Sequence, residues 1–513
     1  MEQNKTTPRA WAETACLILL VLSFFSMMFV TPLRSAIFFP LVFAALIAYS
    51  LYRDVRVECA DELEVGIPRY TPILNAGHFF FMIALVLVFS HVFWGGISWL
   101  RLASFLADLT ISVSIYYLIL ALCLPALRRW FNARTCGVLW MLPLLLVIFY
   151  YAEGTSLHRR PLFVLDIPQE LLLPLLAVWL GGAALVLGWN ILSHLRFRRF
   201  LLKDAVPAED EATRTVWTQV CREAHRKDIP PVSRSANAKT PLSIGLFHPH
   251  VVLPEKDYTQ EDLALVLKHE LVHIMRQDSQ NKFFLAFLRA LGWFNPLMWL
   301  AMRKSSDDFE LSCDETVLQS ADEDQRQRYA GLLLHTAGDQ RGFTTCLSAS
   351  ASALRYRMRA VVLPSRRFVG GLLAGVLVFL LFSMSGHVAL SLGRGSGEEL
   401  LFPGGREACS LVSVLDQRFG KRYESADGDA ILDYLSDLPL QQISGNFSFA
   451  PDSFSWEEDS QELYFQLESG EQRFSLSLTA LGLQANNGPQ PDSYLVDADI
   501  DWAYLESLLG PAA

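Results

Sequence analysis

The chain has little charge for its length and few cysteines. Of its 513 residues only 19% are Asp, Glu, Lys or Arg and 52% are hydrophobic, which disfavours an ordinary soluble enzyme and is typical of a membrane protein. Its eight cysteines contain no C-x-x-C pair, and Cys409 is the single cysteine after Leu392, so this C-terminal tail forms no internal disulfide. The net charge of −10 argues against nucleic acid as a direct partner.

Basic residues are scarcest in the tail, where roughly 21 acidic residues accompany roughly 6 basic ones. This acidity fits a solubilising surface better than a site for cations or cationic peptides. A cleavable signal sequence is also lacking, because the first apolar segment runs directly into a second, as in an uncleaved anchor.

Long apolar runs are abundant. A membrane-spanning helix needs about 20 apolar residues, and seven segments approach that length, the second being the weakest because it leaves little room for a preceding turn. The predicted spans are 14–31, 36–52, 73–93, 104–126, 136–153, 168–193 and 367–391.

Basic clusters follow alternate spans, and such clusters remain in the cytoplasm. This rule predicts a cytoplasmic N-terminus, a cytoplasmic block at 195–367 and an extracellular tail, with Arg159 and Arg160 as an exception. We therefore expect a polytopic, mainly α membrane protein with a cytoplasmic α+β domain and a small extracellular α+β domain. The predicted parts are a membrane domain of about six helices at 1–199, the cytoplasmic domain at 200–366, a last span at 367–391 and a sensor-like tail at 392–513.

Three polar residues, His78, His91 and Asp108, fall near predicted span ends. Anchoring at the membrane interface explains them better than a transport pathway does. Paired half-spans broken by Gly and Pro, which would favour a transporter, are not visible in the sequence.

The cytoplasmic block contains clear start signals for strands and helices. Residues 240–254 (TPLSIGLFHPHVVLP) alternate in polarity between prolines, which predicts one or two strands. Thr259 and Asp262 form a capping box before a helix with apolar residues at helical spacing. Farther on, Asn295 as N-cap and Pro296 as first helical residue predict another helix.

The first of these helices carries His269, Glu270 and His273 in the pattern H-E-x-x-H. Residues i and i+4 share one helix face, so both imidazoles can bind one metal ion, and Glu270 can reach a water there. Chance occurrence on a solvated helix face is disfavoured because this helix is apolar. The sequence therefore predicts a Zn²⁺ site with Glu270 as the general base.

Such a site needs a third protein ligand. The helix after Asn295 offers Glu310, with Asp314 one turn later to orient a ligand histidine. Spacing alone does not decide among the acidic residues of this stretch, which are Asp307, Asp308, Glu310, Asp314 and Glu315.

A ligand from this later helix constrains the topology. If residues 283–302 crossed the membrane, Glu310 and His269 would lie on opposite sides and the site could not close. Arg289 and the Asn-Pro pair at 295–296 favour a hairpin instead, held near the membrane surface by its apolar parts.

Four blocks resemble, in order and spacing, the membrane metallopeptidases of the BlaR/MecR antirepressor family. The resemblance covers about 200–365 and extends loosely to the flanking spans. It implies a gluzincin-like zinc endopeptidase in which His269, His273 and Glu310 bind zinc, Glu270 is catalytic and Asp314 supports a ligand. Cys313 matches a family position, and we interpret it as a small buried residue rather than a nucleophile. The blocks are PLSIGLFHPHVVLP, LALVLKHELVHIMRQD, WFNPLMWLAMRK and FELSCDETVL.

The resemblance also implies a role. Family members transmit an external signal inward and cleave a cytoplasmic repressor or themselves. We therefore expect a multi-pass protein of the bacterial plasma membrane whose partners are the lipid bilayer, a protein substrate and an unknown extracellular signal.

One departure from the family concerns the tail. Its single lysine is Lys421, and the residue three positions earlier is Arg418, so the S-x-x-K motif of covalent β-lactam sensing is absent. The tail's own pattern predicts helices near 408–419, 429–438 and 501–509 and strands near 462–468, 472–481 and 493–500.

Two other functions stay open. One is a constitutive quality-control protease similar to CAAX-prenyl and HtpX-type enzymes, and the other is a non-catalytic receptor or scaffold, which the presence of Glu270 disfavours.

The stretch PLSIGLF fits a substrate-pairing strand and a core strand equally well. A second donor for the reacting carbonyl oxygen is expected, with Arg328 and His335 as candidates.

Overall fold

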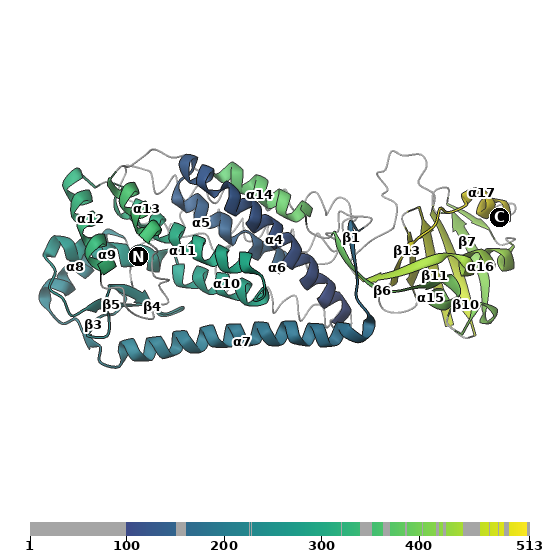
Figure 1. Cartoon of the computed structure of the whole chain (residues 1–513), viewed down its shortest axis with the longest axis horizontal. Helices are drawn as coiled ribbons and strands as arrows, with labels where there is room; N and C mark the ends of the chain where they lie inside the picture. The colour runs from purple at the N-terminus through teal and green to yellow at the C-terminus, as the bar shows by residue number, and fades with distance from the viewer. Residues whose placement is uncertain are drawn as a thin grey trace, which may run out of the picture.

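The computed structural model is elongated, with a helical body joined by one long strand to a strand-rich end (Figure 1). The predicted spans 14–31, 36–52 and 73–93, with His78 and His91, lie outside the described residues. The structure describes residues 99–149, 161–224, 226, 228–319, 321–338, 351–362, 370–384, 387–402, 404–416, 420–423, 427–444, 462–470, 472–480, 482–486 and 492–509.

Two helices in the described part are long and apolar enough to cross a membrane. They are α4 (Trp99–Trp130) and α7 (Gln169–Leu202), which contain nearly all of the predicted spans 104–126 and 168–193. Only a small share of the apolar stretch of α7 is buried by protein. Its apolar side chains therefore face outward, as a lipid-facing helix requires.

Two other predicted spans are shorter as helices. The segment 136–153 is divided at Leu142 into α5 (Ala133–Met141) and α6 (Pro143–Phe149), and α5 is buried on almost every side. The last span contains α14 (Gly371–Met384), and the prediction of a helix to residue 391 is wrong because a strand begins at Val388. Residues 388–391 form a strand because their backbone pairs with distant strands, and a local apolar run does not reveal such pairing.

A buried ion pair joins the helical body to the region of the H-E-x-x-H motif. Arg128, near the end of α4, donates from Nε to Asp308 Oδ1 at 2.7 Å, and the Trp140 indole of α5 donates to Asp308 Oδ2 at 2.8 Å. Asp308 is fully buried on α11 (Pro296–Val317). Burial raises the pKa of Asp308 to about 6, although Arg128 opposes that rise. Both oxygens of this carboxylate are thus committed to holding α11 against α4 and α5.

Helix starts in the motif region follow the sequence signals. Thr259 caps α9 by accepting from the Asp262 backbone N–H, and Asn295 caps α11 by accepting from that of Leu297. The predicted hairpin at 283–302 is present, because α10 ends at Leu291 and α11 starts at Pro296. The remaining helices here are α8 (Glu211–Glu223), α9 (Gln260–Met275), α10 (Asp278–Leu291), α12 (Glu323–Gly338) and α13 (Ala351–Val362).

A four-stranded sheet lies beside α9 (Figure 1). The predicted strand region 240–254 forms two strands, with a turn that includes Gly245 at φ +112°. A Cβ on Gly245 would lie 2.2 Å from the His248 carbonyl oxygen, so this turn requires glycine. In the order β2-β3-β5-β4, strand β4 is at an edge; the bounds are β2 (Val206–Pro207), β3 (Val232–Ser235), β4 (Leu242–Ile244) and β5 (His250–Pro254).

The distal end is built on a sheet of nine described strands in the order β1-β6-β9-β13-β12-β11-β10-β7-β8. Short helices α15 (Gly397–Leu401), α16 (Gly428–Asp437) and α17 (Trp502–Leu508) and the 3-10 turn η2 (Arg406–Ala408) accompany it. The strands are β1 (Phe163–Asp166), β6 (Val388–Ser396), β7 (Cys409–Asp416), β8 (Lys421–Tyr423), β9 (Pro439–Ser444), β10 (Glu462–Ser469), β11 (Gln472–Thr479), β12 (Gly482–Asn486) and β13 (Asp492–Val496).

Strand β6 connects the two ends of the molecule. It begins soon after α14 and pairs in parallel with β1, which lies just before α7. Asp108 of α4 is fully buried and accepts from the backbone N–H groups of His387 and Val388. Asp108 thus anchors the start of β6, and the predicted boundary at residue 392 falls inside this strand.

The tail prediction was right for most elements and wrong for one. Helices were found near 429–438 and 501–509, and strands at all three predicted places. The predicted helix at 408–419 is instead β7, which pairs with β10. The spacing of its apolar residues fits both a helix and a strand, and pairing with β10, some fifty residues away, makes it a strand.

Candidate metal centre

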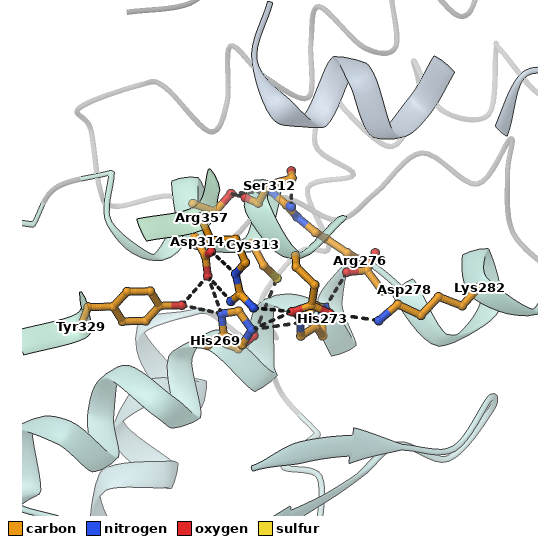
Figure 2. Close-up of polar contacts among 12 residues, drawn as sticks. His269, His273, Arg276, Asp278, Lys282, Ser312, Cys313, Asp314, Tyr329 and Arg357 are labelled. Atoms are coloured by element: carbon orange, nitrogen blue, oxygen red, sulfur yellow. Dashed lines mark hydrogen bonds and ion pairs between the residues drawn. The ribbon is translucent and has the colours of Figure 1, made fainter. Parts of the chain in front are cut away.

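Both motif histidines project from one face of α9 toward a common point (Figure 2). Their Nε2 atoms are 3.1 Å apart, and the two rings lie edge to face. The i, i+4 spacing produces this approach, as the sequence predicts.

Asp278 fixes the ring of His273. Its Oδ2 lies 2.7 Å from His273 Nδ1, so Nδ1 carries the proton and Nε2 presents its lone pair. Gln277, between α9 and α10, has φ +54° and ψ +37°, and it is the non-glycine residue with positive φ in the described part of the chain. This left-handed residue turns the chain so that Asp278 comes back to the histidine.

A relay of two residues fixes the ring of His269. Tyr329 of α12 donates its hydroxyl to Asp314 Oδ1 at 2.7 Å, and the same hydroxyl oxygen lies 2.7 Å from His269 Nδ1. The hydroxyl has one proton, and it donates that proton to Asp314. His269 Nδ1 must therefore carry a proton and donate to the hydroxyl oxygen, so that the lone pair of Nε2 is available to a metal ion. Burial and the Asp314 carboxylate raise the pKa of Tyr329 well above its usual value, so the hydroxyl stays protonated.

Glu310 brings a carboxylate oxygen to the same point. Its Oε2 lies 3.6 Å from His269 Nε2 and 3.5 Å from His273 Nε2. Ligands held about 2.0–2.2 Å from a tetrahedral zinc ion are about 3.4 Å apart. The three donor atoms therefore fit the edges of a zinc coordination tetrahedron.

Three of the other acidic residues that spacing left open have different partners, and the fourth, Asp307, lines the cavity beside the site. Asp308 binds Arg128 and Trp140, and Glu315 accepts from the backbone N–H of Ala133. Asp314 is fully occupied by Arg357 and Tyr329, with its Oδ1 still 3.5 Å from His269 Nδ1.

Cys313 is a second candidate donor, since its sulfur lies within 4.8 Å of ligand atoms of His269 and His273. It is buried, however, and its Sγ is directed at the backbone carbonyl of His269 at 3.9 Å. Burial raises the pKa of this thiol, an effect that His273 only partly offsets. The Glu310 carboxylate oxygen, by contrast, lies 3.5 and 3.6 Å from the two Nε2 atoms and is directed at them.

Two cations lie beside the Glu310 carboxylate. Lys282 Nζ lies 3.1 Å from Oε1, and Arg357 NH1 lies 3.6 Å from Oε2. Burial alone would raise the pKa of Glu310, but Lys282 and His273 together hold it well below its usual value. The carboxylate is thus available to a cation at neutral pH.

A cavity of about 490 Å³ opens beside these atoms. Glu270 lines it but is itself only 5% exposed. Within the described residues no hydrogen bond or ion pair engages the Glu270 carboxylate, so it is free to accept a proton. The part of its apolar wall that comes from α7, α10 and α11 includes Leu187, Ile191, Leu195, Phe283, Ala286 and Met302.

Sequence reasoning missed three residues of this centre, Asp278, Tyr329 and Arg357. Its suggestion for a second donor, Arg328, instead binds Glu261 on the first turn of α9 at 2.5 Å. The side chain of His335 lies outside the described part. A signal for Asp278 was present, since it comes directly after the motif helix.

The same region of the chain matches a known protein family. Residues 163–361, from β1 to α13, match the model described as BlaR1 peptidase M56. This part of the chain belongs to the BlaR/MecR-type membrane metallopeptidase family. The description of the matching model names a peptidase.

Curated relatives match the same M56 region. The regulatory protein BlaR1 of Bacillus licheniformis is 30% identical over 187 residues, which are 35% of this chain and 30% of that protein. The methicillin resistance mecR1 protein of Staphylococcus aureus is 25% identical over 169 residues, 31% of this chain and 28% of that protein. The matches thus span less than a third of these relatives.

Replacing Asp278 by Asn should weaken zinc binding to the M56 region about 10- to 100-fold, because His273 loses the carboxylate that orients it. The measurement is competition for zinc with a chromophoric chelator. Asp257→Asn, an exposed site before α9, is the matched control and should bind zinc like the wild type. Equal affinities in the two variants would contradict the role of Asp278.

Proposed function

We propose that the chain is a membrane-embedded zinc endopeptidase that hydrolyses peptide bonds on the cytoplasmic side. The observation that carries this proposal is the meeting of His269 Nε2, His273 Nε2 and Glu310 Oε2 at 3.1, 3.5 and 3.6 Å. Zinc bound there supplies a Lewis acid for the scissile carbonyl and lowers the pKa of its bound water to about 7.

The residues of the chain carry the proton transfers. Glu270, which lines the cavity, removes the proton from the attacking water and later delivers it to the leaving amine. Asp278 and Tyr329 keep both imidazoles in the tautomer that presents Nε2. Asp314 supports His269 through Tyr329.

The cavity supports an extended peptide substrate. Strand β4 is an edge strand, and its residues line the same cavity as Glu270, so a substrate can pair with it by strand addition. The apolar wall from α7 and α10 favours a large apolar side chain near the cut bond.

The membrane setting supports a transducer. Basic residues at the end of α7 come just before the sheet and helices that carry the metal centre, which favours a cytoplasmic position for that centre. The distal sheet, beyond α14, would then be extracellular and receive an unknown signal. By analogy with the BlaR1 and MecR1 relatives, the substrate is a transcriptional repressor or the chain itself.

Metal removal tests the proposed activity. Purified full-length chain, offered a library of peptides from bacterial proteins, should cleave a subset and lose all cleavage with 1,10-phenanthroline. Added Zn²⁺ should restore the activity, whereas Mg²⁺ should not, because a site with two imidazoles suits zinc. The non-chelating isomer 1,7-phenanthroline is the control. Full cleavage by a zinc-free sample would refute the proposal.

A constitutive quality-control protease is the rival function. Comparing the cellular proteins cut by wild type and by Glu270→Gln separates the two. Cleavage confined to one regulator, and dependent on the distal domain, supports a transducer. Cleavage of many membrane proteins, independent of that domain, supports housekeeping.

A further inference from the structure

The guanidinium of Arg357 is held rigidly beside the metal centre. From α13, its Nε donates to Asp314 Oδ2 at 2.6 Å and its NH2 donates to Asp314 Oδ1 at 2.7 Å. This two-bond fork fixes the plane of the group, and only 13% of the side chain is exposed. The remaining nitrogen, NH1, is not needed for the fork.

NH1 points toward the place where chemistry would occur. It lies 3.6 Å from Glu310 Oε2, the oxygen that also lies 3.5 and 3.6 Å from the two Nε2 atoms. Arg357 also lines the cavity that contains Glu270. A substrate carbonyl that entered the cavity beside Oε2 would therefore come close to NH1 as well.

Peptide hydrolysis needs a donor at this place. The carbonyl oxygen gains negative charge as water attacks, and a fixed donor that meets this charge is worth about 10²–10³ in kcat. Glu270 is anionic in that step and cannot serve. The donor must therefore be another group that lines the cavity.

Other described cations of the cavity are less suitable. Lys282 binds Glu310 through the opposite oxygen, Oε1, at 3.1 Å. Arg289 donates to Asn190 and stacks at 4.5 Å on the Trp299 ring, toward α7. Arg357 combines a fixed plane, a spare N–H group and nearness to the ligand oxygen.

We propose that Arg357 is a catalytic residue whose NH1 group donates to the scissile carbonyl oxygen as that oxygen becomes negative. The inference rests on the proposed peptidase function and adds a residue to it. As the water oxygen bonds to the carbonyl carbon, Glu270 takes the water proton. When the C–N bond breaks, that proton passes to the leaving nitrogen, and Arg357 stays protonated throughout.

The test compares Arg357→Lys with wild type in the full-length chain, on a peptide that wild type cleaves. Lysine keeps the charge and can bind Asp314, but its single nitrogen cannot hold both Asp314 oxygens and also occupy the position of NH1. We expect kcat to fall about 10²–10³-fold, with KM nearly unchanged and zinc bound at one ion per chain. Affinity for a phosphonamidate analogue of the same peptide should fall in parallel, while affinity for its reduced-amide analogue should not.

Two comparisons guard against a merely structural effect. In Arg357→Ala, guanidinium ion added to the assay should restore part of kcat if the missing group acts on substrate. Lys282→Met removes one charge from the other oxygen of Glu310. Equal loss of kcat in Lys282→Met and Arg357→Lys would show that charge alone matters and would overturn the inference.

The remaining outcomes are distinct. Arg357→Lys with wild-type kcat, or with zinc lost in proportion to activity, overturns the inference and leaves the peptidase function standing. Thermal unfolding of the metal-free variants shows whether a loss reflects misfolding, and in that case the guanidinium rescue decides. A zinc-loaded wild-type chain that cleaves no peptide overturns both the inference and the function.

Discussion

Glu270→Gln should lower kcat by about 10²–10⁴-fold and leave zinc binding intact. The carboxylate lies in the cavity without a partner among the described residues and is not one of the atoms that converge on the metal point. Glutamine has nearly the same shape but cannot accept a proton from water. Peptide cleavage and bound zinc, measured on the same purified sample, give the two quantities.

The control for this variant is Glu261→Gln, on the first turn of the same helix. Glu261 is 70% exposed and binds Arg328, so its loss should change neither kcat nor zinc. If Glu270→Gln cleaved peptides at the wild-type rate with zinc bound, another base would have to be found. If it lost zinc, Glu270 would belong among the ligands.

Glu310→Ala should raise the zinc Kd by more than about 100-fold, since changing a residue that only orients a ligand already costs 10- to 100-fold. The reason is that Oε2 supplies one of three donor atoms around the site. Isothermal titration with a competing chelator measures the affinity directly. Cleavage should disappear together with the metal.

Cys313→Ala is the decisive partner of this experiment. Cys313 lies in the same His-His group but directs its sulfur at a backbone carbonyl. Its replacement should keep the zinc Kd within about tenfold, because only packing changes. The opposite pattern, with zinc lost in Cys313→Ala and kept in Glu310→Ala, would assign the third ligand to the thiol.

Local signals in the sequence were sufficient for the helices that carry the centre. The capping box at Thr259 and the Asn-Pro pair at 295–296 predict the starts of α9 and α11, and both starts are confirmed. Such signals work because a cap is satisfied by backbone groups only two or three residues away. The convergence of His269 and His273 follows from helix geometry in the same way.

Contacts between distant segments were beyond these signals. The local sequence does not show which of Glu310 and Asp308 is the metal ligand. Glu310 faces the histidines of α9, whereas Asp308 faces α4 and α5, and only the tertiary packing determines this. Tyr329 and Arg357 reach the centre from helices 60 and 88 positions after His269. The helix predicted at 408–419 failed for the same reason, since β10 determines the conformation of β7.

The pairing of β1 with β6 has a mechanical consequence. Four residue pairs, from Phe163 with Val388 to Asp166 with Ser391, join the strand after α14 to the strand before α7. The distal sheet is therefore connected to the helical body through two segments, one running from α14 into β6 and the other from β1 into α7. The second of these helices, α7, also forms a wall of the cavity.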